Sequence, residues 1–143
     1  MKQLTFLTLA LFLSLSGLTA QSDVPDAAKQ HFGDAYPNAQ DVEWEKEING
    51  YEVEYKIDGQ EYESTYDNDG TVMYTKEEIE TRDLPQAIVS ATQRDYSDRT
   101  IDDPERITYP DGRVVYKLEL EHSDDRDFDA WYQEDGSLIE LDR

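Results

Sequence analysis

The fold of this chain is decided by residues 51–66, which read YEVEYKIDGQEYESTY. Apolar and polar side chains alternate through this stretch, with an aromatic or aliphatic residue at almost every second position. A period of two is typical of a strand with one buried face, and Asp58 followed by Gly59 is a hairpin turn signal. The stretch therefore predicts two antiparallel strands that share an apolar face and carry glutamates on the other.

The same alternation continues on both sides of this hairpin. Residues 42–48 predict a preceding strand, with Ile48 at the end of its apolar face, and Asn49 with Gly50 predicts the turn that follows. Residues 71–75 predict a fourth strand. We therefore expect four antiparallel strands with one apolar face.

A helix is expected before the strands. Apolar residues recur at helical spacing after Asp23 and again after Asp83. Aspartate is a good N-cap, and in both places a proline two residues later falls in the first turn, where proline is tolerated. The sequence predicts helices capped by Asp23 and Asp83, and Pro37 is expected to end the first of them.

The chain repeats this pattern once. Three blocks of the first half match three blocks of the second half in the same order: 23–27 with 83–87, 53–57 with 114–118, and 66–70 with 132–136. Such ordered matches indicate an internal duplication, which places Ile107 and Tyr109 on the apolar face of the second copy. We predict an α+β fold of two tandem units, residues 21–80 and 81–143, each a helix packed on a four-stranded antiparallel sheet.

Residues 1–20 have the layout of a secretory signal peptide. Lys2 precedes an apolar run from Leu4 to Leu15, and small residues lead to Ala20. A transmembrane anchor is the alternative, but the run is short for a bilayer and no second apolar run follows it. We expect cleavage near Ala20, a periplasmic or secreted product, and no membrane span after cleavage.

Composition excludes several classes of function. The chain has 13 Lys and Arg against 34 Asp and Glu, a net charge of −21, which repels phosphate and argues against binding to nucleic acid. There is no cysteine, hence no disulfide, thiolate nucleophile or zinc–cysteine site. No serine nucleophile elbow or zinc-protease motif is present either. We predict a protein that is not an enzyme and needs no cofactor.

Several of these features resemble a known family. They are the acidic residue before Val-Pro or Leu-Pro, the tyrosine that ends each helix, the tryptophan strand, the pattern Tyr-x-Val-x-Tyr at 51–55 and the pattern Tyr-Asp-x-Asp-Gly at 66–70. Together they are similar to the PepSY-like, beta-lactamase-inhibitor-protein-like domains exported by Bacteroidetes, and the resemblance covers residues 23–143.

This resemblance implies a function as well as a fold. In the inhibitor after which the family is named, the paired sheets form a concave protein-binding surface, and related PepSY modules are associated with the restraint of peptidases. The resemblance therefore implies an exported protein-binding module that inhibits or modulates an envelope or secreted enzyme such as a peptidase.

The face of the sheet opposite the helices differs between the two copies. The first copy carries glutamates there, among them Glu52, Glu54, Glu61 and Glu63. The second copy has apolar residues at matching places, namely Trp131, Val115, Ile139 and Leu141. Apolar groups ringed by charge are typical of a binding surface, so we predict that these residues anchor an exported partner with a basic surface. The alternative is that the chain ends or the other copy cover this face and bury Trp131.

A second hypothesis concerns ions. The residues Asp124, Asp125, Asp127 and Asp129 form an acidic cluster that is a candidate for weak binding of Ca²⁺, with a solvated acidic loop as the alternative. The loop at 67–70 fails the spacing of an EF-hand. On this hypothesis the protein is an acidic ion-binding or matrix module without a specific protein target.

Overall fold

The computed structural model describes residues 24–124 and 126–142, so the predicted signal peptide at 1–20 lies outside the described residues. The elements follow one another as α1 (Asp26–Ala35), β1 (Gln40–Glu47), β2 (Gly50–Ile57), β3 (Gln60–Asp67), β4 (Val72–Glu78), the short 3-10 helix η1 (Thr81–Asp83), α2 (Gln86–Asp95), β5 (Thr100–Thr108), β6 (Val114–Glu121), β7 (Phe128–Gln133) and β8 (Leu138–Asp142). The α+β class and the order of helix then four strands in each copy are confirmed.

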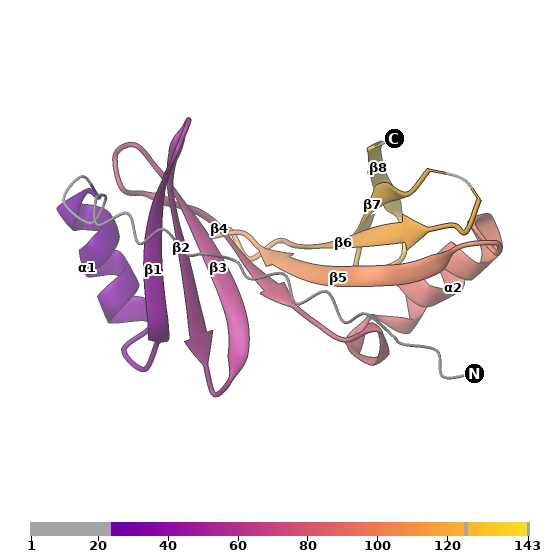
Figure 1. The fold of residues 1–143 in the computed structure, drawn as a ribbon, viewed down its shortest axis with the longest axis horizontal. Helices are drawn as coiled ribbons and strands as arrows, with labels where there is room; N and C mark the ends of the chain where they lie inside the picture. Colours follow the sequence, from indigo (N-terminus) through magenta and orange to yellow (C-terminus); the bar gives the residue numbers. More distant parts are fainter. Residues whose placement is uncertain (1–23, 125, 143) are drawn as a thin grey trace, which may run out of the picture.

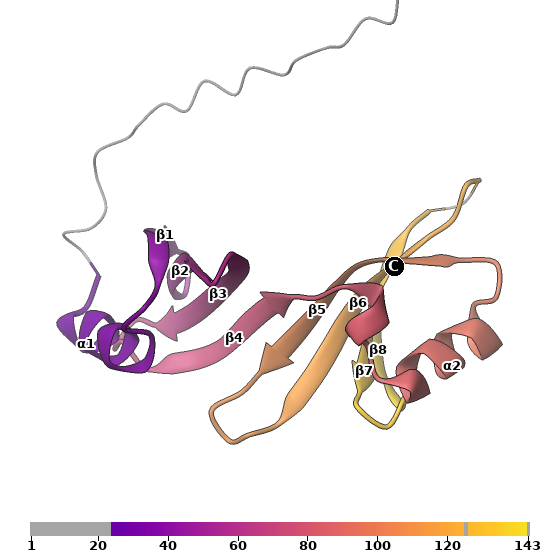
Figure 2. The same cartoon turned by 90° about the horizontal axis from the view of Figure 1, so that it is seen from below.

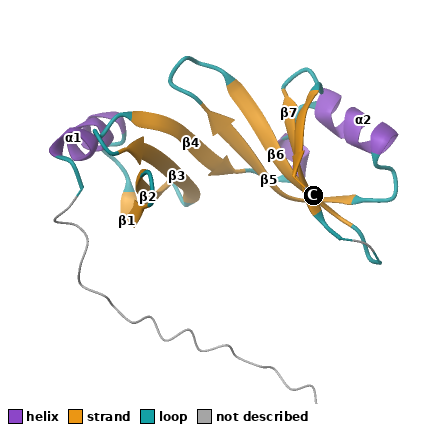
Figure 3. Ribbon diagram, turned by 90° about the horizontal axis from the view of Figure 1, so that it is seen from above, coloured by secondary structure: helices purple, strands orange, loops and turns teal. Residues whose placement is uncertain are grey.

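The two copies share one sheet. All eight strands form a single antiparallel sheet in sequence order, and the helices lie at opposite ends of the long axis (Figures 1 and 3). The pairing of β4 with β5, from Thr75 opposite Thr108 to Glu78 opposite Glu105, joins the copies in the middle of the molecule (Figure 2). The two repeats therefore continue into one another within a single sheet.

Two apolar clusters hold the helices against the sheet. The first contains Val24, Ala28, Phe32, Tyr51, Val53, Tyr55 and Tyr66. The second contains Leu84, Ile88, Ala91, Tyr116, Leu118, Leu120, Phe128, Ala130 and Tyr132. The predicted apolar face of residues 51–66 is thus confirmed, because its residues pack beneath α1 in the first cluster. The two clusters share no residue.

Both helices pack on the same face of the sheet. Glu77 pairs with Tyr62, which packs against the first core, and also with Arg106 of β5. Arg106 in turn pairs with Tyr116 of the second core. Side chains of directly paired residues point to the same side of a sheet, so this row of pairs connects the two helix-covered regions. We call the opposite side the helix-free face.

The predicted helix starts are wrong by two residues. Pro25 and Pro85, rather than the aspartates, occupy the N-cap positions, without a side-chain capping hydrogen bond. A proline holds the residue before it in an extended conformation, and Leu84 accordingly has φ −65° and ψ 142°. Leu84 is buried against the second core instead, while Asp83 belongs to η1 and Asp23 lies outside the described residues.

The predicted turn between β1 and β2 is wrong by one residue. Ile48 and Asn49 form the turn, Glu47 pairs with Gly50, and the Ile48 side chain is 94% exposed rather than on the apolar face. Gly50 belongs to β2, where a Cβ atom would lie only 1.9 Å from the carbonyl oxygen of Tyr66. Close approach of two backbones, and not turn geometry, requires this glycine.

Candidate partner-binding face

A bulge in β5 determines what the helix-free face contains. Asp102 pairs with Glu119, but Glu105 pairs with Lys117, so β5 holds one extra residue between these pairs. One extra residue exchanges the two faces of the strand beyond it. Ile107 consequently pairs with Val115 on the helix-free face, which corrects the expectation that it belongs to the apolar face under the helix.

Apolar side chains gather at the centre of this face. Ile107 is 2% and Val115 5% exposed, although neither belongs to the clusters under the helices. The rings of Tyr74 and Tyr109 lie 6.0 Å apart, and the Arg113 guanidinium sits 4.0 Å from the centre of the Tyr109 ring. We define the central patch as Tyr74, Ile107, Tyr109, Val115 and Trp131.

Sequence reasoning missed Tyr74 and assigned Tyr109 to the other face. The strand 71–75 is short, and β3 and β4 shift register between Thr65 and Tyr66, so alternation alone does not determine where Tyr74 points. Tyr109 follows the bulge in β5 and changes face with Ile107. The Asp-Asp-Pro sequence before Glu105 was an available signal, because proline within a strand often marks a bulge.

The four predicted apolar anchors do not form one exposed patch. Trp131 pairs with Lys117 on the helix-free face and is half-buried, whereas Val115 is buried. Glu140, and not Leu141, is the partner of Trp131, because Leu141 pairs with Ala130 of the core. Ile139, which is 48% exposed, lies at the register shift beside them. Trp131 and Val115 therefore contribute to the central patch.

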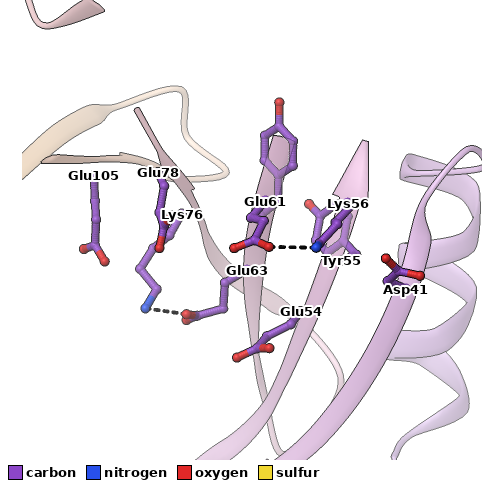
Figure 4. A pocket seen from close by; sticks show the side chains of 10 residues that line it. Asp41, Glu54, Tyr55, Lys56, Glu61, Glu63, Lys76, Glu78 and Glu105 are labelled. Atoms are coloured by element: carbon purple, nitrogen blue, oxygen red, sulfur yellow. Dashed lines mark ion pairs between the residues drawn. The ribbon is translucent and has the colours of Figure 1, made fainter. Parts of the chain in front are cut away.

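The predicted glutamates do share the helix-free face. Glu54 pairs with Glu63, Glu61 pairs with Lys56, and Glu52 pairs with Thr65. Beside the central patch, Glu54, Glu61 and Glu63 border a hollow of about 180 Å³, which Glu52 does not line (Figure 4). Its charged lining consists of Asp41, Glu54, Lys56, Glu61, Glu63, Lys76, Glu78 and Glu105. Carboxylates predominate, so the hollow attracts cations.

Three lysines on this face form ion pairs with carboxylates of the same sheet. Lys56 lies 2.8 Å from Glu61 and Lys76 lies 2.6 Å from Glu63, as the dashed lines of Figure 4 mark. Lys117 lies 3.2 Å from Asp129. Burial opposes the charge of Lys76, but the hydrogen bond and the charge of Glu63, together with the charges of Glu105 and Glu52, outweigh burial and raise the pKa of Lys76. The remaining carboxylates leave the face negative.

Glu52 has the most perturbed carboxyl group of this face. Burial, together with the neighbouring carboxyl of Glu63, raises its pKa to about 7. Lys76 acts in the opposite direction, because its positive charge favours an ionised Glu52. Glu52 therefore changes charge near neutral pH.

The acidic cluster of the ion-binding hypothesis is partly engaged by the chain. Asp127 accepts a hydrogen bond of 2.9 Å from the backbone N–H of His122, and Asp129 forms an ion pair with Lys117. Asp124 lies in the same loop, and Asp125 lies outside the described residues. Among the residues described, no group of three or more His, Cys, Asp or Glu side chains is placed to hold a metal ion. Cation binding by this cluster remains a prediction of the sequence.

We expect no cation-specific stabilisation by this loop. Among the described residues no three ligands converge here, and the Lys117 ammonium already neutralises part of the Asp129 charge, which reduces the gain from binding Ca²⁺. Calorimetric melting in low millimolar Ca²⁺ should match melting in NaCl of equal ionic strength. A saturable rise of Tm that occurs only with Ca²⁺ would contradict this and favour the ion-binding hypothesis.

Solved structures share this fold. A BLIP-like protein from Bacteroides fragilis matches with a TM-score of 0.72 and 24% identity, over 82% of this chain and 84% of that one. A DUF2874 family protein from Bacteroides uniformis matches with a TM-score of 0.77 and 15% identity, over 82% and 88%. A Bacteroides eggerthii protein described as a "putative periplasmic" protein matches with a TM-score of 0.76 and 13% identity, over 82% and 87%. At these identities the likeness concerns the fold.

The sequence itself matches one protein family. The family described as "Putative beta-lactamase-inhibitor-like, PepSY-like" matches twice, over residues 17–74 and 57–140. No curated protein matches the chain. No helix of the described part is long and apolar enough to cross a membrane. The two family matches span both repeats, and this chain therefore belongs to the PepSY-like, beta-lactamase-inhibitor-like family.

Proposed function

We propose that this protein is an exported, non-enzymatic binding module that docks a partner protein with a basic surface on its helix-free face. One observation carries the proposal: an apolar patch, with a carboxylate-rich hollow beside it, lies on a sheet face that neither helix covers. Docking on this face inhibits or modulates the partner, which we take to be an envelope or secreted enzyme such as a peptidase.

The chemistry of the face supports this partner. Aromatic side chains such as Trp131 and Tyr109 supply contact area at low entropic cost, and such residues dominate the binding energy of interfaces. The carboxylates around the hollow favour a partner with lysines and arginines and raise its association rate. The patch supplies affinity in this arrangement, and the glutamates supply selectivity.

The family and its relatives support the remaining parts of the proposal. The family description and the BLIP-like protein of Bacteroides fragilis favour an inhibitor-like role. The "putative periplasmic" description of the Bacteroides eggerthii protein agrees with the signal peptide expected at residues 1–20. We therefore place the mature protein in the periplasm or outside the cell.

We expect Trp131→Ala to weaken partner binding by about 2 kcal/mol, roughly 30-fold in Kd, because it removes the largest side chain of the central patch. Immobilised wild type and variant would be compared for capture from an envelope extract. A protein retained by the wild type and lost with the variant would then be purified, and its Kd measured at low and high salt.

The matched control is Ile48→Ala, which removes an apolar side chain that is 94% exposed at a hairpin tip, away from the patch. This control should keep the affinity of the wild type. Higher salt should weaken wild-type binding, since a basic partner is held partly by charge. If Trp131→Ala remains folded and binds the same partner with unchanged affinity, the central patch is not the docking site.

A further inference from the structure

A buried carboxylate oxygen on the helix-free face lacks a hydrogen-bond donor. Glu63 uses Oε2 to bind the Lys76 ammonium at 2.6 Å. Its other oxygen, Oε1, is buried and has no donor among the described residues. A buried acceptor without a donor is costly, so a proton from a neighbouring group would stabilise this site.

Glu52 is placed to supply that proton. It pairs with Thr65 across the β2–β3 ladder, and Glu63 lies two residues along the same face of β3. Diagonal neighbours of this kind are within reach of long side chains. A carboxyl group donates only when protonated, so a bond from Glu52 to Glu63 Oε1 requires one proton shared by the pair.

The charges that face Glu52 disfavour its ionisation, with one exception. The acidic neighbours are Glu45, which pairs with Glu52 across β1 and β2, Glu47 of β1, Glu54 of β2 and Glu63 of β3. The neutral neighbours are Thr65 of β3 and Tyr74 of β4, and the positively charged neighbour is Lys76 of β4. Neither α1 nor α2 packs on this side of the sheet. Lys76 is the only cation among these groups, and it is bound to Glu63. Burial and the pairing with Glu63 raise the pKa of Glu52 to about 7, in agreement with this arrangement.

We propose that Glu52 and Glu63 share one proton, and that its release makes the helix-free face more negative and tightens its hold on a basic partner. On release, the proton passes from the Glu52 carboxyl to solvent, and two carboxylates then face the single ammonium of Lys76. The binding half of this inference rests on the proposed function. The proton sharing does not rest on it, because Glu52 and Glu63 would share the proton in the absence of any partner.

The sign of the effect on stability follows from linkage. Glu52 has its ordinary pKa of 4.5 in the unfolded chain and a raised one in the folded chain, so the folded protein binds more protons between about pH 4.5 and 7. Stability should therefore fall as pH rises through this window and level off above it. Glu52→Gln keeps a donor for Glu63 but cannot ionise, so Tm should rise relative to wild type at about pH 8 and change little at about pH 5.

The direct test is an NMR titration of the glutamate side-chain carboxyl carbons in the purified protein. One glutamate should titrate well above the ordinary range in the wild type, and this titration should vanish in Glu52→Gln. It should persist in Glu43→Gln, which removes one negative charge from the same face without contacting Glu63. If every glutamate of the wild type titrates below about pH 5.5, the shared proton does not exist.

The binding half is tested with an oligolysine peptide as a defined basic probe. At constant ionic strength, its affinity for the wild type should rise by about two- to fivefold between pH 6 and pH 8, and Glu52→Gln should lose this rise. Equal pH dependence in the two proteins would overturn the coupling of the proton to binding. If no glutamate titrates at a raised pH, the shared proton is refuted even if an envelope protein is captured. If no protein is captured, the proposed function fails but the titration still tests the shared proton.

Discussion

Gly50→Ala should destabilise the protein by about 3 kcal/mol and lower Tm by roughly 10 °C. The added Cβ would lie 1.9 Å from the carbonyl oxygen of Tyr66 and 3.0 Å from its carbonyl carbon. These are backbone atoms, and no rotamer change relieves the clash, so β2 and β3 must separate. Both strands carry the first apolar core, with Tyr51, Val53 and Tyr66 buried in it. Urea denaturation with far-UV circular dichroism measures the loss.

The matched control is Gly33→Ala in α1. A Cβ at this position meets nothing within 4 Å, and alanine is the better helix former. This control should stabilise the protein by about 0.5–1 kcal/mol. The same chemical change thus has opposite signs at the two sites, and a Gly50→Ala protein as stable as the wild type would show that β2 and β3 are not this close.

Leu118→Ala should cost about 2–5 kcal/mol, and the loss should fall mainly on the second copy. Leu118 is fully buried beneath α2, where its removal leaves a cavity. The two cores have no residue in common, and the copies are connected through the four-pair ladder of β4 with β5, the ion pair of Arg106 with Glu77 and the ring contact of Tyr74 with Tyr109. Local stability can differ between regions connected by so few contacts.

Each copy contains one tryptophan that reports on it. Trp44 lies 5.6 Å from the Phe32 ring in the first core, and Trp131 lies on β7. In a Trp44→Phe background, Leu118→Ala should lower the midpoint reported by Trp131 fluorescence. In a Trp131→Phe background, the midpoint reported by Trp44 should fall less. Equal falls in both backgrounds would show that the eight-stranded sheet unfolds as one unit.

Local rules predicted the elements of this protein well where one residue type acts alone. Asp58 and Gly59 form the predicted turn with positive φ angles of 53° and 86°, and they join β2 to β3 in the expected register. Pro37 follows directly after α1, which ends at Ala35 with Tyr36 as its C-cap. Proline narrows and glycine widens the range of allowed backbone dihedral angles, whatever their neighbours are. Their effects can therefore be predicted from the sequence.

Local rules failed where two distant segments meet. Gly50 reads as a turn residue, but its role comes from the Tyr66 carbonyl, sixteen positions further along the chain. Asp83 reads as an N-cap, but Leu84 is drawn into the second core and the helix starts after Pro85. In both cases a tertiary contact outweighed a preference of about 1 kcal/mol.

The α+β class, the duplication and the acidic rows of the helix-free face can be predicted from the amino-acid order alone, because strand alternation and repeated blocks are local patterns. The folded chain was needed to see that both copies share one sheet and that Ile107, Tyr109 and Tyr74 join Trp131 on its helix-free face. A single extra residue in β5 reverses which side chains are buried by the helix, and the strand pairing that reveals this residue exists only in the folded chain.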